Sequence, residues 1–214
     1  MKIIATAAQL NSGKDVFSDH LAKVLNAQKN DVWVRGAFAN AVKDTFCSSF
    51  GVDRDFIEKW KRVPEPPPGM KMPIRQSLQF IGDGFRQIVP DIWIDIALRG
   101  DHNMILSDSR YVNEAKAVKK KNGFVFLMYR PGYLNNDPNP SEAQIKPLVE
   151  FCVKNLREGF IPKYDKSKSL FGHDIPEDLQ YYDYFLVNNG SIEDLHRKTE
   201  EVIAPALVDY FKGY

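Results

Sequence analysis

The sequence predicts an α/β protein with a central, mostly parallel sheet wrapped by helices. Short apolar segments of strand character alternate with longer segments of helical spacing, which indicates βαβ units. A length of 214 residues suits one domain, or one domain with insertions, and is sufficient to bury a substantial core. No internal repeat or low-complexity tract interrupts this organisation.

The expected elements follow in order along the chain. Strands are expected at apolar segments of β-forming residues: 2–6, 32–34, 103–107, 124–129 and 184–187. Helices are expected where apolar residues recur at helical spacing: 15–26, 38–50, 53–61, 112–121 and from 191 toward 211. Asp53 caps one helix, Asn122-Gly123 ends another, and Ser191 with Asp194 forms a capping box for the last.

Two proline-rich stretches, residues 62–73 and 130–140, break the alternation. Long loops of this kind inside a compact domain are often functional lids. A third polar insertion, residues 160–180, has no motif to which we assign a role. Residues 75–86 contain Gly82 and Gly84, which lower helix stability and indicate the close approach of a ligand or of a neighbouring backbone.

Composition excludes several functional classes. With 29 Lys and Arg against 28 Asp and Glu, the net charge of +1 gives no global attraction to nucleic acid or to membrane surfaces. The N-terminus does not have the pattern of a signal peptide, and no apolar run approaches membrane-spanning length. Cys47 and Cys152 lack metal-ligand or redox spacing, so we expect free thiols in a reducing cytoplasm. The histidines show no metal-ligand spacing and receive no role: His20, His102, His173 and His196.

The segment between the first strand and the first helix resembles a nucleotide phosphate-binding loop. The pattern G-x-x-x-x-G-K-[ST] is met at Gly13 and Lys14, whereas Ala8 replaces the first glycine and Asp15 the hydroxyl residue. In such a loop the backbone N–H groups and the helix N-terminus hold phosphates, and the lysine reaches the transferred phosphate. The alternative is an ordinary glycine-containing turn in an α/β domain.

Two carboxylates could bind Mg²⁺ near this loop. Asp15 could ligate the ion directly or through water, or could simply favour the positive end of the helix. Asp108 is expected to follow a buried strand, where a carboxylate commonly orients Mg²⁺ or a substrate hydroxyl. Its alternative role is to cap the next helix, and we favour the functional one.

Arginines provide the cations that phosphoryl transfer requires. Four of them lie beside loops or strand ends: Arg75, Arg86, Arg110 and Arg130. A guanidinium binds a phosphate dianion in bidentate fashion, although any one arginine taken alone is better explained as a solvated surface residue. Gln79 offers a base both a donor and an acceptor. Trp93 either stacks on a ligand or fills the core, and we favour the core.

Several segments together resemble the bacteriophage deoxynucleoside monophosphate kinases, within the P-loop nucleoside monophosphate kinase group. The resemblance covers most of the chain in the right order, and its ordered combination is more specific than any single motif. It rests on these segments: S-G-K-D at 12–15, F-A-x-x-x-K at 38–43, R-x-x-L-Q-x-x-G at 75–82 followed by Arg86 and P-D-x-W at 90–93, D-x-R-[FY]-x-N-E-A at 108–115, lid residues 130–132 and 140–142, and 183–185 with 188–190. The chain departs from the family at Ala8 and at Val16, where glycine and threonine are usual.

The resemblance implies a P-loop kinase fold with a helical monophosphate-binding subdomain at about residues 38–100 and a lid at about 130–180. It implies transfer of a phosphate from ATP, with Mg²⁺, to a deoxynucleoside monophosphate. The implied partner is this deoxynucleoside monophosphate substrate, and neither a membrane nor a nucleic acid is expected as a partner. The expected location is the cytoplasm, or the host cytoplasm for a phage protein. The oligomeric state is open, with a homodimer as the first expectation.

The resemblance also assigns residues. The donor nucleotide would contact Asn11, Ser12, Gly13, Lys14, Asp15 and Val16 at its phosphates, and Asn188 and Gly190 near adenine. The acceptor would contact Phe38, Lys43, Arg75, Gln79, Gly82, Arg86, Trp93, Asp108, Arg110, Asn113 and Glu114. Mg²⁺ would lie near Asp15 or Asp108, and Arg130 would enter from the lid. Lys14 and the four arginines would stabilise the charge of the transition state.

Two other functions remain open from sequence. One is a kinase of the same fold with another acceptor: a modified base in DNA, dephospho-coenzyme A or a small phosphorylated metabolite. The near-neutral charge argues mildly against DNA. The other is a non-catalytic nucleotide-binding protein, which Ala8 and Asp15 would favour.

Overall fold

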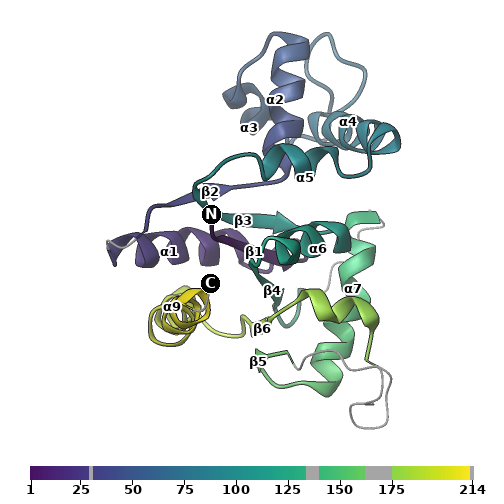
Figure 1. Ribbon diagram of the computed structural model, residues 1–214. Helices are drawn as coiled ribbons and strands as arrows, with labels where there is room; N and C mark the ends of the chain where they lie inside the picture. The colour runs from purple at the N-terminus through teal and green to yellow at the C-terminus, as the bar shows by residue number, and fades with distance from the viewer. Residues whose placement is uncertain (29–30, 134–139, 162–174, 213–214) are drawn as a thin grey trace. The chain divides into compact units, whose positions relative to one another are not determined.

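The computed structural model describes residues 1–28, 31–133, 140–161 and 175–212. The chain divides into two compact units. The first unit contains Met1–Gly36 and Gly100–Tyr214, and the second is the intervening stretch Ala37–Arg99. The colours of Figure 1 follow the chain from one unit into the other and back.

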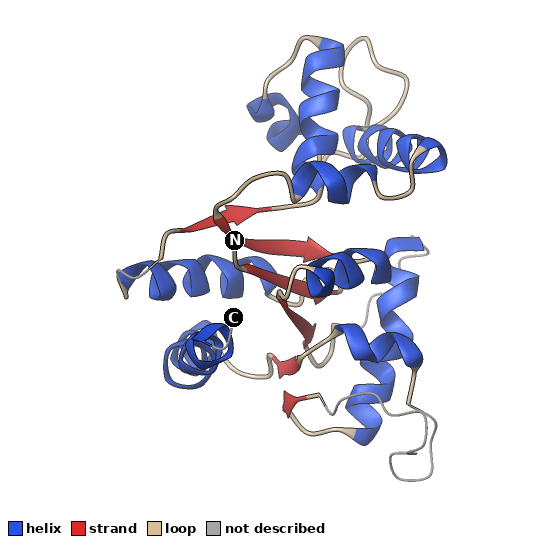
Figure 2. Cartoon of the chain, viewed as in Figure 1, coloured by secondary structure: helices blue, strands red, loops and turns tan. Residues whose placement is uncertain are grey.

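The described part of the first unit contains a six-stranded sheet with the order β2-β3-β1-β4-β6-β5. β5 pairs with β6 in antiparallel fashion, and the other pairs are parallel. Figure 2 shows the strands in red. The strands are β1 (Ile3–Ala8), β2 (Trp33–Gly36), β3 (Asn103–Ser109), β4 (Phe124–Tyr129), β5 (Gly159–Phe160) and β6 (Tyr184–Val187). The prediction of an α/β protein with a mostly parallel sheet is confirmed.

Helices cover both faces of this sheet (Figure 1). On one face, α1 (Lys14–Ala27), α8 (Ile192–Lys198) and α9 (Ala204–Lys212) close a core with β1, β4 and β6. On the other face, α6 (Val112–Lys120) contacts β1 and β4, and α7 (Pro140–Asn155) contacts β4. Every residue of β1 is buried, as expected for a central parallel strand that is covered on both sides.

Several boundaries differ from the predicted ones. β1 and β3 each run two residues further, so Asp108 lies inside β3 and does not follow the strand. α7 was not predicted: residues 130–140 were expected to be a proline-rich loop, and no element was assigned directly after them, although proline is tolerated in the first turn of a helix. β5 and the 3₁₀ helix η1 (Glu177–Tyr181) lie in segments to which no structure was assigned. The last helix consists of α8, a π-helical turn η2 (Thr199–Ile203) and α9.

The second unit is helical. Its helices are α2 (Ala39–Phe50), α3 (Arg54–Trp60), α4 (Ile74–Ile88) and α5 (Ile92–Ala97). α2 contacts each of the other three, and the fully buried side chains of Phe46, Ile57 and Ile74 form its core. Asp53 caps α3 as predicted, because its carboxylate accepts the Phe56 N–H at 2.8 Å. Residues 62–73 contain no helix or strand, in agreement with the predicted loop.

α4 is continuous despite its two glycines. Gly82 is buried where α5 approaches, and its carbonyl accepts the indole N–H of Trp93 at 2.9 Å. A Cβ at Gly82 would lie 3.3 Å from Nη1 of Arg86, whereas one at Gly84 would meet open space. The close approach of a neighbouring side chain therefore explains Gly82, and nothing in the structure explains Gly84. Trp93 fills the core of this unit, which is the role that we favoured for it.

Candidate phosphate-binding site

The carboxyl ends of four strands of the first unit lie at one edge of the sheet. Ala8 at the end of β1 is in register with Met128, and Ala7 with Ser109 at the end of β3. Tyr129 at the end of β4 is in register with Val187 at the end of β6. The segments that follow these strands therefore leave the sheet together, at the edge where open α/β sheets bind ligands. They carry residues 9–13, Arg110, Arg130 and Asn188.

The loop at residues 9–13 has the geometry of a tight turn into a helix. Asn11 and Gly13 both adopt the left-handed conformation, with φ values of 64° and 90°. Gly13 is the N-cap of α1, which then runs for 14 residues. The first N–H groups of a helix have no partner within the helix, and together with the helix dipole they favour an anion.

Ala8 is compatible with this geometry. It is the last residue of β1, and its methyl group is fully buried in the same core as Phe17 and Met128. Because the residue belongs to the strand and lies before the turn, it needs no positive φ, and its side chain has a place in the core. The substitution of the first glycine therefore does not disturb the turn.

Lys14 lies at the start of α1 with a side chain that is only 10% exposed. Its ammonium Nζ lies 3.2 Å from the Asp15 carboxylate, which is 65% exposed. The sequence reasoning missed Arg35 of β2, whose Nη2 lies 4.0 Å from the same carboxylate and whose Nε donates to Asp19 at 2.6 Å. Asp15 thus lies between two cations, and a bound phosphate would compete with it for both.

Two polar side chains of the loop are buried without a partner. Gln9 is 4% and Ser12 2% exposed, and within the described residues neither Gln9 Nε2 nor Ser12 Oγ has a hydrogen-bond partner. Leaving a buried donor unpaired typically costs about 1–3 kcal/mol. A bound phosphate would supply hydrogen-bond acceptors of the kind that both groups lack. Gln9 was not among the predicted residues, because its position in the motif accepts any amino acid.

The segment after β3 contains several of the predicted residues. Glu114 is buried, and its Oε2 accepts the backbone N–H groups of Arg110 at 2.8 Å and Tyr111 at 3.2 Å. This arrangement caps the N-terminus of α6, so the contacts of Glu114 are structural. They also fix the backbone of Arg110 at the edge of the sheet. Asn113 is exposed in the first turn of α6, and Asp108 is half-buried in β3.

The predicted metal residues offer only oxygen ligands. Among the described residues, no group of three or more His, Cys, Asp or Glu side chains could hold a metal ion. Mg²⁺ commonly binds through one or two carboxylates together with substrate phosphates and water. Asp15 and Asp108 fit an ion that arrives with a nucleotide, because each offers a carboxylate at the edge where the loop lies.

The predicted lid, at about residues 130–180, is described in part. Arg130 follows β4, and its guanidinium carbon lies 4.3 Å from the ring centre of Tyr133. Residues 134–139 and 162–174 of the predicted lid lie outside the described residues. Outside the predicted lid, Asn188 follows β6, and its Nδ2 donates to the Ser12 carbonyl at 2.8 Å.

The remaining predicted residues belong to the second unit. Arg75, Gln79, Gly82 and Arg86 recur at spacings of four, three and four, which places them along one stripe of α4. Lys43 of α2 forms an ion pair with Glu58, in which Nζ and Oε1 lie 3.1 Å apart. Phe38 is the N-cap residue of α2, and its side chain is buried. α4 therefore carries two arginines and one amide along one stripe, which the buried Gly82 interrupts, next to the apolar stripe that faces its own core.

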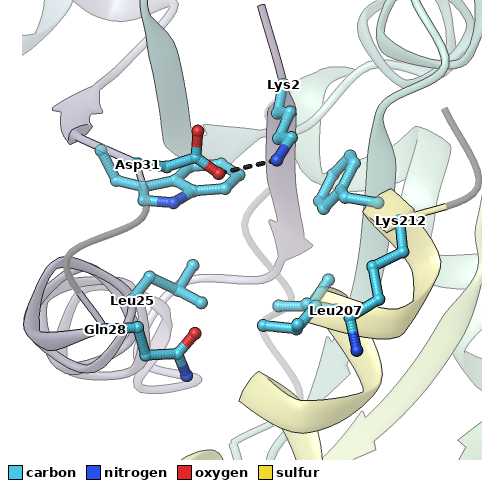
Figure 3. Close-up of a pocket in the computed structure, with 9 residues that line it drawn as sticks. Lys2, Leu25, Gln28, Asp31, Leu207 and Lys212 are labelled. Atoms are coloured by element: carbon cyan, nitrogen blue, oxygen red, sulfur yellow. Dashed lines mark hydrogen bonds and ion pairs between the residues drawn. The ribbon is translucent and has the colours of Figure 1, made fainter.

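A pocket of about 190 Å³ opens at the opposite edge of the sheet, where β1 and β2 begin. It has an apolar lining that includes Leu25, Trp33 and Leu207, and Figure 3 shows the Lys2–Asp31 ion pair across it. None of the predicted site residues lines this pocket. Its lining offers no concentration of phosphate-binding groups, so we place the candidate site at the carboxyl edge.

Comparison with known proteins gives one distant relative and no family assignment. No family model matches the chain. Over 97 residues the chain is 26% identical to a protein of Acanthamoeba polyphaga mimivirus described as "Putative deoxynucleotide monophosphate kinase". The alignment covers 37% of this chain and 50% of that protein. The chain therefore spans about half the length of the curated relative that it matches.

None of the helices in the described ranges combines the length and the apolarity that crossing a membrane requires.

Proposed function

We propose that the chain is an ATP-dependent kinase of the P-loop type that phosphorylates deoxynucleoside monophosphates to diphosphates. The observation that carries the proposal is the loop at residues 9–13, which precedes the N-terminus of α1 and the buried Lys14 and contains two buried, unpartnered polar groups. The mimivirus relative, whose description names the same activity, supports the choice of reaction class.

The donor phosphates would be bound by the loop N–H groups, by Lys14 and by the side chains of Gln9 and Ser12. Lys14 would exchange its contact with Asp15 for a phosphate oxygen, which releases the Asp15 carboxylate. Mg²⁺, when bound, would neutralise charge between the phosphates, with Asp15 and Asp108 as its protein ligands. Arg35 would remain near the released carboxylate and keep it from repelling the nucleotide.

The acceptor phosphate would be bound by arginines. Arg75 and Arg86 supply two guanidinium groups on one stripe of α4, and Gln79 between them offers a donor and an acceptor to a base. Because the acceptor is already an anion, the reaction needs positioning and charge stabilisation and no general base. Arg110 and Arg130 would stabilise the transferred phosphoryl group from the carboxyl edge.

The test is an assay of ADP release with ATP, Mg²⁺ and a panel of deoxynucleoside and nucleoside monophosphates. We expect turnover with at least one deoxynucleoside monophosphate and its loss in Lys14→Ala. Lys23→Ala is the matched control, because Lys23 is an exposed residue of the same helix, and this variant should keep wild-type turnover.

Other outcomes would assign other functions. Turnover with DNA but with no free monophosphate would replace the acceptor that we propose. ATP binding without transfer to any acceptor would identify a nucleotide-binding protein and would contradict the kinase assignment.

A further inference from the structure

Asn188 joins the end of β6 to the phosphate-binding loop. Its backbone N–H donates to the Tyr129 carbonyl at 2.8 Å, which fixes the residue to the edge of the sheet. The residue is only 7% exposed, and its side-chain Nδ2 donates to the Ser12 carbonyl at 2.8 Å, across a separation of 176 residues. A rigid strand end therefore holds one backbone carbonyl of the loop.

The same amide lies against the next residue of the loop. A Cβ at Gly13 would lie 2.5 Å from Asn188 Nδ2, which is closer than such atoms approach in real structures. Gly13 also needs its left-handed φ of 90°. Asn188 thus contacts two consecutive residues of the loop and occupies the space that a side chain at Gly13 would need.

The bond to Ser12 has a consequence for the donors of the loop. In a planar trans peptide the C=O and N–H groups point in opposite directions. Because Asn188 holds the Ser12 carbonyl on its own side, the N–H of Gly13 must point away from Asn188. The glycine would otherwise allow this peptide to rotate, since it tolerates both signs of φ. Asn188 therefore fixes the direction of one N–H group of the proposed phosphate-binding loop.

We propose that Asn188 is a positioning residue that sets the shape of the phosphate-binding loop and thereby acts on the phosphate end of the nucleotide. The proposal rests on the proposed function and deepens it. It differs from the role near adenine that the sequence resemblance implies for Asn188. A contact with the base would strengthen the binding of ATP alone, whereas a positioned loop strengthens the binding of any polyphosphate.

The experiment compares ATP with inorganic tripolyphosphate, which carries the phosphates but no base. Calorimetry gives the Kd of each ligand for the wild type, Asn188→Ala and Asn188→Asp. We expect Asn188→Ala to weaken both ligands by the same factor, about five- to tenfold, which is the loss of one hydrogen bond. Asn188→Asp should weaken both further, because a carboxylate repels the Ser12 carbonyl and the phosphates.

Asn189→Asp is the matched control, because it adds the same charge at an exposed neighbouring residue. It should weaken tripolyphosphate binding less than Asn188→Asp does. Thermal unfolding checks that each variant is folded. If Asn188→Ala does not fold, Asn188→Ser provides the test with a smaller hydroxyl donor, and it should bind both ligands with Kd values above those of the wild type.

Three outcomes would count against the proposal. A variant that loses affinity for ATP but binds tripolyphosphate as the wild type does would assign Asn188 to the base. Unchanged Kd values for both ligands in folded variants would overturn the positioning role and leave the proposed function intact. A wild type that binds neither ligand would overturn the proposed function, and this inference with it.

Discussion

At the scale of single residues, Lys14 and Asp15 form an ion pair at the start of α1. Lys14 is largely buried, and its ammonium lies beside the exposed Asp15 carboxylate. A partly buried cation without any counter-charge is costly, so Asp15 stabilises the lysine in the absence of a ligand. Because Asp15 also lies near Arg35, the carboxylate keeps two cations close together at the start of α1. The Asp at this position is thus compatible with phosphate binding.

Gly13→Ala should damage both the fold and the binding of phosphate. The new methyl group would lie 2.5 Å from Asn188 Nδ2, and the positive φ would be strained. We expect the free energy of unfolding to fall by about 1–3 kcal/mol and ATP binding to be lost. Denaturant titration and calorimetry measure the two effects.

Gly84→Ala is the matched control for that substitution. Gly84 lies within α4, and a Cβ there would meet open space. The same change should therefore raise the free energy of unfolding by about 0.5–1 kcal/mol, because alanine favours a helix more than glycine does. Equal destabilisation by the two variants would contradict our description of Gly13.

Cys152 should be unreactive in the folded protein. Burial raises the pKa of its thiol to about 12, so the reactive thiolate is absent at neutral pH. An aromatic disulfide reagent at about pH 8 should modify Cys152 only after denaturation, as followed by mass spectrometry of the peptides. The folded pKa lies above the unfolded one, so this thiol lowers stability only as the pH rises above about 9. Rapid modification of Cys152 in the native protein would contradict its burial.

At the scale of elements, α4 combines a stripe that packs in a core with a stripe to which we assign a ligand. Its apolar residues, including Ile74, pack against α2 and α3, and a second stripe carries Arg75, Gln79 and Arg86. Gly82 lies in this second stripe, and its carbonyl accepts the indole N–H of Trp93. The periodicity of 3.6 residues therefore places the predicted acceptor residues on one line, and their binding role remains a prediction.

Arg75→Ala and Arg86→Ala test that stripe. At least one variant should raise the KM for the acceptor or lower kcat by about tenfold or more, because a charge-assisted bidentate contact would be lost. The KM for ATP should change less, and steady-state kinetics with each substrate varied separately measures the difference. Arg99→Ala, at an exposed residue of the same unit, is the control. Wild-type kinetics in both variants would show that the acceptor binds elsewhere.

At the scale of the whole first unit, a half-buried ion pair joins its layers. Lys119 of α6 donates to Asp183 before β6 at 2.7 Å, to the Gly123 carbonyl at 3.0 Å and to the Tyr210 hydroxyl of α9 at 3.1 Å. Asp183 also accepts the Val125 N–H of β4 at 2.8 Å. Burial raises the pKa of Asp183 despite these contacts. This network connects helices from both faces at the edge of the sheet opposite the candidate site.

Lys119→Met should destabilise the protein by about 1–3 kcal/mol at neutral pH, because it leaves the half-buried Asp183 carboxylate without its cation. The loss should shrink in acidic solution, since a carboxyl group with a raised pKa becomes neutral on acidification and then needs no partner. Denaturant titrations at the two pH values measure this difference. Lys120→Met, at an exposed neighbour on the same helix, should change stability little at either pH.

Contacts distant in sequence also escaped prediction. His20 and His196 were assigned no role, yet their rings are stacked with centres 3.7 Å apart. His20 Nε2 also lies 2.7 Å from Glu200 Oε1. Arg35 reaches Asp15 and Asp19 from a neighbouring strand, and Asn188 reaches Ser12 from the far end of the chain. No local sequence pattern predicts such pairs, because each pair depends on which strands and helices become neighbours in the fold.

The sequence by itself determined the alternation of strands and helices, the position of the loop before α1 and the stripe on α4. These features follow from local periodicity, capping residues and glycine positions, which act over a few residues. Only the tertiary structure decided that Asp108 lies inside β3 and that Ala8 is a core residue. It also decided that Asn188 holds the Ser12 carbonyl. These facts depend on strand order and register, which bring together residues that no short segment of sequence can relate.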